Sequence, residues 1–136
     1  MRQWINLTES ASMILYHGTP ETFDKFDIEK IVDGGPFGRG IHFTNSYKTA
    51  KIYSGEQEPL KANITLKNPY VISRSGDSES SQQMNYFQQT RIFRPVSTAR
   101  ERLMKMGYDG VVLKEDDYIE VVVYDTSTID ILGRGK

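Results

Sequence analysis

The chain of 136 residues contains no cysteine, which excludes disulfide bonds, a thiolate nucleophile and any cysteine-based zinc site. It contains only two histidines, so a site that needs imidazole has to use His17 or His42. Neither sign of charge dominates, because 17 Lys and Arg residues stand against 18 Asp and Glu residues, for a net charge of −1. Polyanion binding driven by overall charge is therefore not expected.

Long apolar runs are also missing. No stretch approaches the roughly 18 consecutive apolar residues of a membrane span, and residues 1–9 are too interrupted by polar side chains to form a signal peptide. We therefore expect a soluble cytoplasmic protein without a membrane partner. The length and the 38% hydrophobic fraction suffice for one domain with a real core, residues 1–136, in which residues 1–11 form an N-terminal extension.

The pattern of apolar and polar residues predicts an α+β domain made mostly of strands, with about three helices. Strands are predicted over residues 13–17, 41–44, 61–67, 70–73, 108–113, 118–125 and 128–132. Helices are predicted over residues 1–11, from an N-cap at Asn45 or Ser46 through Tyr53 to Gly55, and from a capping box of Thr98 and Glu101 to Gly107, with Ala99, Leu103 and Met106 on one face. Residues 18–39 are expected to form a loop with one helical turn around 23–30, and residues 74–83 a polar loop.

One carboxylate, Glu120, interrupts an apolar run near the end of the chain. On a strand it shares a face with Tyr118 and Tyr124, while Ile119 and Val121 point to the opposite, core side. A charge among such neighbours is costly without a partner. A salt bridge to an arginine is the favoured interpretation from this segment alone; the functional alternative is a carboxylate that faces a cleft and stabilises positive charge.

His17 follows an apolar run and precedes Gly18 and Thr19. Because glycine has no Cβ, a ligand can approach the backbone closely at Gly18, and imidazole can exchange hydrogen bonds with a sugar hydroxyl. The alternative is a histidine that merely caps the loop, and for so short a motif this alternative is favoured.

A third segment contains Gly40, Ile41 and His42, followed by the predicted helix that carries Tyr53. Four and three residues before Tyr53, small side chains at positions 49 and 50 share its helix face, so they form with its ring a slot for a flat aromatic ligand. The alternative is that Tyr53 belongs to the core. The Gly-x-Gly pair lacks the third glycine and the strand-then-helix context of a dinucleotide fold.

Taken in order, these segments resemble the three motifs of the diphtheria-toxin-like and poly(ADP-ribose)-polymerase-like ADP-ribosyltransferases, the His-Tyr-Glu group. Tyr16-His17-Gly18-Thr19 looks like the first motif, residues 37–43 with Tyr53 resemble the second, and residues 118–125 resemble the strand that bears the catalytic glutamate. Leu66-Lys67-Asn68-Pro69 and Gly107-Tyr108-Asp109-Gly110-Val111 are similar to small bacterial and phage members. The resemblance covers roughly residues 14–132.

This resemblance implies two twisted, mostly antiparallel sheets in a split sandwich, with NAD as co-substrate in the cleft and no metal. It implies that His17 binds the adenosine-side ribose, that Tyr53 stacks on nicotinamide, and that Glu120 binds the 2′-hydroxyl of the nicotinamide ribose. The backbone of Gly18 would hold the nicotinamide amide. The expected catalytic residues are Glu120, His17, His42 and Tyr53, and the expected NAD contacts are His17, Gly18, Thr19, Gly40, Ile41, Thr49, Ala50, Tyr53 and Tyr118.

Two positions, His42 and Ala50, depart from the family pattern, and a third, Tyr118, bears on the branch. His42 replaces the first tyrosine of a pair that flanks nicotinamide, and imidazole can still cover one face of the ring. Ala50 replaces a small hydroxyl residue, which Thr49 can supply instead. Tyr118 stands where the arginine-specific branch carries Glu or Gln, which argues against that branch.

The expected activity is therefore mono-ADP-ribosyl transfer, in which NAD is cleaved at its nicotinamide glycosidic bond and a macromolecule accepts the ADP-ribose. Alternatives are an NAD glycohydrolase, an inactive module that binds NAD or ADP-ribose, and a metal site of His17, His42 and Glu120. The acidic turn at 114–117 indicates a protein acceptor with a basic surface, whereas basic residues between 91 and 105 leave a nucleic acid acceptor open. A phage, toxin or housekeeping origin is left open as well.

Overall fold

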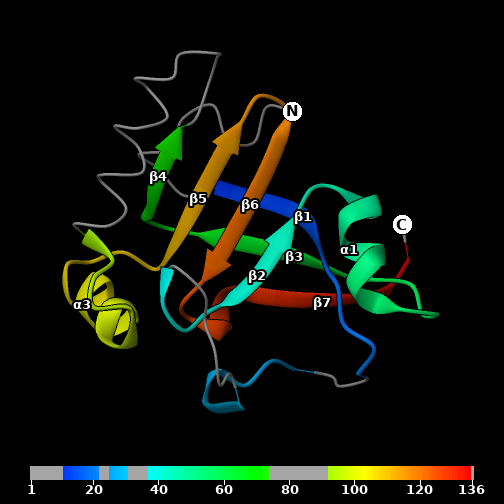
Figure 1. Cartoon of the computed structure of the whole chain (residues 1–136), viewed down its shortest axis with the longest axis horizontal. Helices are drawn as coiled ribbons and strands as arrows, with labels where there is room; N and C mark the ends of the chain where they lie inside the picture. Colours follow the sequence, from blue (N-terminus) through cyan, green and yellow to red (C-terminus); the bar gives the residue numbers. More distant parts are fainter. Residues whose placement is uncertain (1–10, 22–24, 31–36, 74–91, 136) are drawn as a thin grey trace.

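The computed structural model describes residues 11–21, 25–30, 37–73 and 92–135, which form one α+β domain around a seven-stranded sheet (Figure 1). The predicted helix over residues 1–11 lies outside the described residues except for Ala11, which begins a strand. The predicted polar loop at 74–83 lies outside them as well.

The sheet is mixed and has the order β4-β5-β6-β2-β1-β3-β7. Its strands are β1 (Ala11–His17), β2 (Ile41–Thr44), β3 (Leu60–Leu66), β4 (Pro69–Ser73), β5 (Gly110–Glu115), β6 (Tyr118–Val123) and β7 (Ile129–Arg134). Neighbouring strands are antiparallel except β4 and β5, which are parallel. Three 3₁₀ turns accompany them, namely η1 (Ile28–Lys30), η3 (Val96–Thr98) and η4 (Thr126–Thr128).

The backbone pairing of the sheet is shortest between β1 and β2. These strands share one register pair, Tyr16 with Thr44, whereas every other neighbouring pair of strands shares at least four. In Figure 1 the strands β4, β5 and β6 run steeply across the direction of β1, β3 and β7, so the sheet turns sharply at this joint. The structure thus has one continuous sheet where two separate sheets were expected, because the Tyr16–Thr44 pair bridges the halves.

Two hydrophobic clusters pack against the sheet, and β6 contributes to both. Its residues Ile119, Val121 and Val123 lie in the first cluster with β1, β2 and β3, as the alternation predicted. Val122 and Tyr124 lie in the second, which packs against the helix near residue 100. Buried apolar residues therefore lie on both faces of β6 towards its end. The partly exposed side chains, Tyr118 and Glu120, lie on one face near its beginning.

Two α-helices occur in the described residues, against about three expected over the whole chain. The first, α1 (Tyr47–Ser54), begins as predicted after Ser46, whose hydroxyl accepts a hydrogen bond from the Thr49 N–H at 3.1 Å, and ends at Gly55, which has a positive φ of 64°. No helix of the described segments is long and apolar enough to cross a membrane.

The second helix, α3 (Ala99–Lys105), begins after Thr98 and ends before Gly107, as predicted. The Thr98 side chain makes no cap hydrogen bond, so the expected capping box is wrong. Leu103 is buried on the expected face, whereas Met106 is 55% exposed. Met106 is the C-cap residue, where the helix ends.

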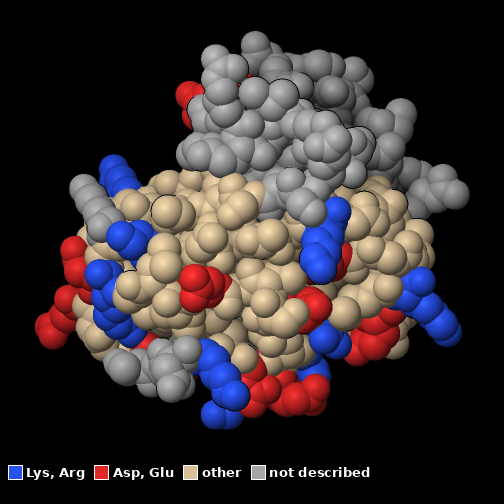
Figure 2. Space-filling view, turned by 180° about the vertical axis from the view of Figure 1, so that it is seen from behind, with Lys and Arg blue, Asp and Glu red and all other residues tan. Residues whose placement is uncertain are grey.

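Surface charges of both signs are mixed. Figure 2 shows one face on which Lys and Arg lie near Asp and Glu around the edge, while the centre of the described surface is mostly uncharged. This mixture agrees with the balanced composition of the chain.

Candidate functional site

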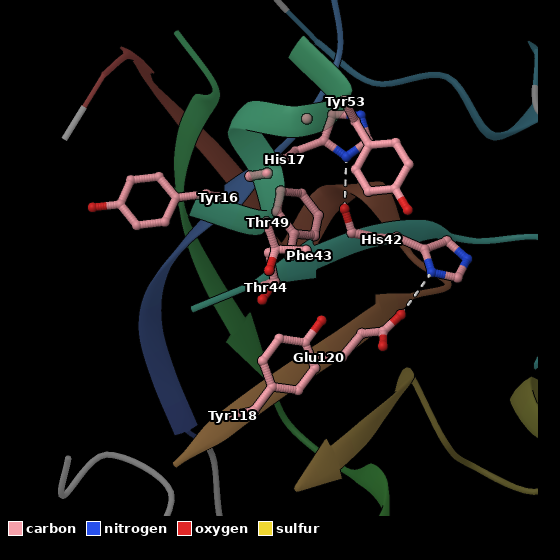
Figure 3. A pocket seen from close by; sticks show the side chains of 11 residues that line it. Tyr16, His17, His42, Phe43, Thr44, Thr49, Tyr53, Tyr118 and Glu120 are labelled. Carbon is pink, nitrogen blue, oxygen red and sulfur yellow. Dashed lines mark hydrogen bonds and ion pairs between the residues drawn. The ribbon is translucent and has the colours of Figure 1, made fainter. Parts of the chain in front are cut away.

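A cavity of about 380 Å³ lies where the ends of β1, β2 and β6 meet α1 (Figure 3). All three segments singled out in the sequence contribute to it. The lining residues are Tyr16, His17, Gly18, His42, Phe43, Thr44, Thr49, Ala50, Tyr53, Tyr118 and Glu120.

Strand register explains why these distant residues meet. Tyr16 of β1 pairs with Thr44 of β2, and Thr44 pairs with Glu120 of β6, so these three lie in one row across the sheet. Residues in one row, and those two positions along a strand, project from the same face. His42 is therefore a diagonal neighbour of Glu120 on that face. Tyr16, Phe43 and Thr44 were not singled out from the sequence, because only the register places them in the cavity.

Glu120 lies within ion-pair distance of His42, with 3.5 Å between Oε1 and Nδ1 (Figure 3). The arginine partner considered for this carboxylate is not found among the described residues; an imidazole takes that place. Both side chains remain partly exposed, 30% for Glu120 and 38% for His42. The His42 ring is thus directed at the carboxylate, rather than placed solely as a cover for a flat ligand.

His17 is held against the core and is neutral in the folded protein. Its Nδ1 lies 2.6 Å from the backbone oxygen of His42, and its ring packs edge-on against Phe26. Because a carbonyl oxygen only accepts, Nδ1 carries the proton and donates it. Burial lowers the pKa of His17 below its usual 6.5. Its Nε2 is then an acceptor, suited to a hydroxyl donor.

Gly18 allows α1 to pack against the end of β1. A Cβ at this position would lie 2.3 Å from the backbone oxygen of Ala50 and 2.7 Å from Cβ of Tyr53, so any larger residue would displace the helix. The absent side chain therefore makes room for α1, in addition to any ligand. Tyr53 is consequently held beside His17, and it is 68% exposed, so the interpretation of Tyr53 as a core residue is wrong.

The structure places the other predicted NAD contacts in two groups. Thr49, Ala50 and Tyr118 line the cavity. Thr19, Gly40 and Ile41 do not belong to its lining.

Each of the three residues outside the cavity has a different environment. Ile41 is a buried core residue. Gly40 faces β6, where a Cβ would lie 2.5 Å from Cγ1 of Val122, so glycine is needed there for packing. Thr19 lies in the loop after His17, where its N–H donates to Oγ of Ser54 at 3.2 Å. The positions of these three residues therefore do not support the expected contacts with NAD.

No group of three or more His, Asp or Glu side chains that could hold a metal ion occurs within the described ranges. The metal-site alternative required His17, His42 and Glu120 together. Instead, Nδ1 of His17 donates to a backbone carbonyl and Nδ1 of His42 faces the Glu120 carboxylate.

One comparison with known proteins, the match to a family model, bears on the chemistry of this cavity. Residues 8–130 match the family model described as ADP-ribosyltransferase in polyvalent proteins. No curated protein matches the chain. A solved structure titled "Crystal structure of an anti-CRISPR protein" is 17% identical, with a TM-score of 0.44, and the alignment covers 89% of this chain and 96% of that one. Because the family match extends over most of the sequence and includes every residue that lines the cavity, this chain belongs to the ADP-ribosyltransferases of polyvalent proteins.

Proposed function

We propose that the protein is a mono-ADP-ribosyltransferase of the His-Tyr-Glu type, which cleaves NAD at the nicotinamide glycosidic bond. The single observation that carries this proposal is the convergence of His17, Tyr53 and Glu120 around one cavity. These residues come from three segments that are far apart in the sequence, and each has the chemistry that a different part of NAD requires.

The residues of the cavity fit the nicotinamide–ribose end of NAD. The cavity volume of about 380 Å³ is near the lower end of the range for ligand pockets, roughly 300–1,000 Å³, so it suits one part of a dinucleotide. The exposed ring of Tyr53 offers a stacking surface for a flat heterocycle. The neutral His17 offers an acceptor to a ribose hydroxyl.

Glu120 stabilises the charge that develops during cleavage. When the glycosidic bond breaks, its electron pair leaves with nicotinamide, and positive charge moves from the nicotinamide ring to the ribose. A fixed carboxylate beside the sugar stabilises this charge in the transition state. A new bond then forms between the ribose C1′ and the acceptor nucleophile, which loses a proton. His42, within ion-pair distance of Oε1, limits the orientations of the carboxylate.

The acceptor is a macromolecule, and we favour a protein surface with basic residues. The turn between β5 and β6 carries Glu115, Asp116 and Asp117, all exposed, and leads directly to Tyr118 at the cavity. Acidic side chains there attract a basic segment and repel phosphate groups. The expected setting is the cytoplasm, where NAD is available.

Two alternatives use the same cavity. In an NAD glycohydrolase, water takes the place of the acceptor. In an inactive binding module, NAD or ADP-ribose binds without cleavage, and the replacement of a tyrosine by His42 is the observation that favours it.

Incubation with NAD labelled in its adenosine part, in the presence of a cell lysate, separates these three functions. We expect release of nicotinamide together with label on a macromolecule. Free labelled ADP-ribose without a labelled macromolecule would identify a glycohydrolase. Saturable NAD binding without nicotinamide release would identify a binding module and contradict the proposed enzyme.

A further inference from the structure

The loop that follows His17 is held by hydrogen bonds on every backbone polar group of residues 19–21. The Thr19 N–H donates to Oγ of Ser54 at 3.2 Å, and the Glu21 N–H donates to Oγ1 of Thr19 at 3.1 Å. The Pro20 carbonyl accepts from Nε2 of Gln57 at 2.5 Å, and proline has no N–H of its own. Irregular loops usually leave such groups to water. This one is fixed by side chains.

Arg134, near the end of β7, supplies the two remaining bonds. Its Nη1 donates to the Thr19 carbonyl at 3.1 Å, and its Nη2 donates to the Glu21 carbonyl. Nη1 also donates to the Glu58 carbonyl at 2.6 Å. One planar guanidinium thus joins the loop after β1 to the segment before β3, a geometry that a lysine ammonium cannot reproduce.

Strand register places Arg134 level with His17. Arg134 pairs with Leu60 of β3, and Leu60 pairs with His17 of β1, so these residues form one row across three strands. The pKa of His17 is lowered mainly by burial and, among smaller causes, by the positive charge of Arg134, which agrees with this proximity. The family match ends at residue 130, so Arg134 lies beyond it.

We propose that Arg134 is a positioning residue for substrate binding: its guanidinium holds residues 19–21 so that His17 and Gly18 are presented to NAD in a preformed arrangement. This inference rests on the proposed function. A loop that is already ordered loses less conformational entropy when a ligand binds, so the ligand binds more tightly. Arg134 takes no part in cleavage of the glycosidic bond, so its replacement affects NAD binding and not the chemical step.

The test compares Arg134→Lys with Arg102→Lys in the full chain. Arg102 makes the same kind of contact elsewhere, because its Nη2 donates to the Ile92 carbonyl at 3.0 Å, and neither residue belongs to the cavity lining. We measure kcat and KM for NAD by nicotinamide release, and amide hydrogen exchange at Thr19 and Glu21 without NAD.

We expect Arg134→Lys to raise KM about tenfold, the effect of losing one charge-assisted hydrogen bond, and to change kcat by less than about twofold. Exchange at the Thr19 and Glu21 amides accelerates. Arg102→Lys lowers the thermal midpoint to a similar degree but leaves KM and both amides unchanged. Gln57→Ala, which removes only the bond to the Pro20 carbonyl, raises KM by a smaller factor and serves if Arg134→Lys does not fold.

Three results overturn the inference: unchanged exchange at both amides in Arg134→Lys, faster exchange with unchanged KM, or an equal rise of KM in Arg102→Lys. Failure of the proposed function is recognised separately, because the wild-type protein then releases no nicotinamide. In that case the exchange rates, which need no NAD, still decide whether Arg134 holds the loop.

Discussion

Replacing Glu120 by glutamine removes one negative charge and keeps the size of the side chain. The carboxylate is the group that lies closest to the chemistry in the proposed reaction, and its side chain is 30% exposed. Glutamine can still contact His42, so the fold and the shape of the cavity are retained. The substitution therefore tests charge in isolation.

The expected loss of rate follows from the strength of one charge interaction in a partly solvated cavity. At an effective dielectric constant near 20, two unit charges about 4 Å apart interact by roughly 4 kcal/mol. The ribose carries only part of a positive charge in the transition state, so about 2–4 kcal/mol is lost, which corresponds to a decrease in kcat of roughly 30- to 900-fold. NAD affinity should change by a much smaller factor, because the charge on the sugar is absent in the ground state.

The assay is nicotinamide release under saturating NAD, accompanied by NAD titration and thermal unfolding of each variant. Glu101→Gln is the matched control, since Glu101 is an exposed carboxylate on α3 outside the cavity. A Glu120→Gln protein as active as this control would refute the electrostatic role. Equal losses of NAD binding and kcat would instead show that Glu120 acts in binding.

Three further predictions concern binding and stability. Tyr53→Ala should weaken NAD binding by roughly 3- to 12-fold through lost stacking, while Ile52→Ala, at a neighbouring side chain that is 72% exposed and outside the cavity lining, leaves the dissociation constant unchanged in calorimetry. Burial lowers the pKa of His17 from 6.5, so the unfolded chain binds this proton at a higher pH than the folded chain, and the free energy of unfolding falls as pH drops below 6.5. His17→Asn should therefore lose less stability than the wild type between about pH 7.5 and 5.5 in urea denaturation, and an identical pH dependence would contradict a buried neutral His17. Tyr124→Phe leaves the buried Phe37 carbonyl without its donor and should lower the free energy of unfolding by about 1–3 kcal/mol. Equal denaturation midpoints for the variant and the wild type would contradict this prediction.

Local features of the fold could be predicted where a single residue determines them. The bounds of β2 were predicted exactly. The N-cap of α1 was predicted at Asn45 or Ser46 and lies at Ser46, and the predicted end at Gly55 is confirmed. The capping box at Thr98 failed because Thr98 ends the turn η3 with ψ near 10° instead of the extended conformation of a capping residue, and its hydroxyl is bonded to the Pro95 carbonyl and Arg102. The prediction that Met106 is buried was wrong, since this residue is the C-cap at the end of the helix.

The arrangement of the sheet could not be derived in the same way. Register between distant strands depends on how whole faces pack, and a single sequence does not contain that information. The row of Tyr16, Thr44 and Glu120 and the parallel pairing of β4 with β5 are examples. The contribution of Arg134 was missed for the same reason, since nothing near it in the sequence indicates a loop more than a hundred residues away.

The motifs predicted which residues lie near one another, but they did not predict the surroundings of each residue. His17, Tyr53 and Glu120 line one cavity. Gly18, however, also has a packing reason that the sequence did not reveal, because it makes space for α1. Ile41 follows a glycine in a plausible ligand segment but points to the core, since alternation along β2 sends every second side chain there.

The joint between β1 and β2 has a mechanical consequence. Glu120 and His42 lie on one side of it and His17 on the other. Among the described residues, β1 and β2 share one register pair there, and a hydrogen bond joins His17 to the His42 carbonyl. Buried side chains of the first cluster, among them Leu15, Phe43 and Val121, pack across this joint. The relative position of the two halves, and with it the width of the cavity, is therefore held by side-chain packing more than by the backbone ladder.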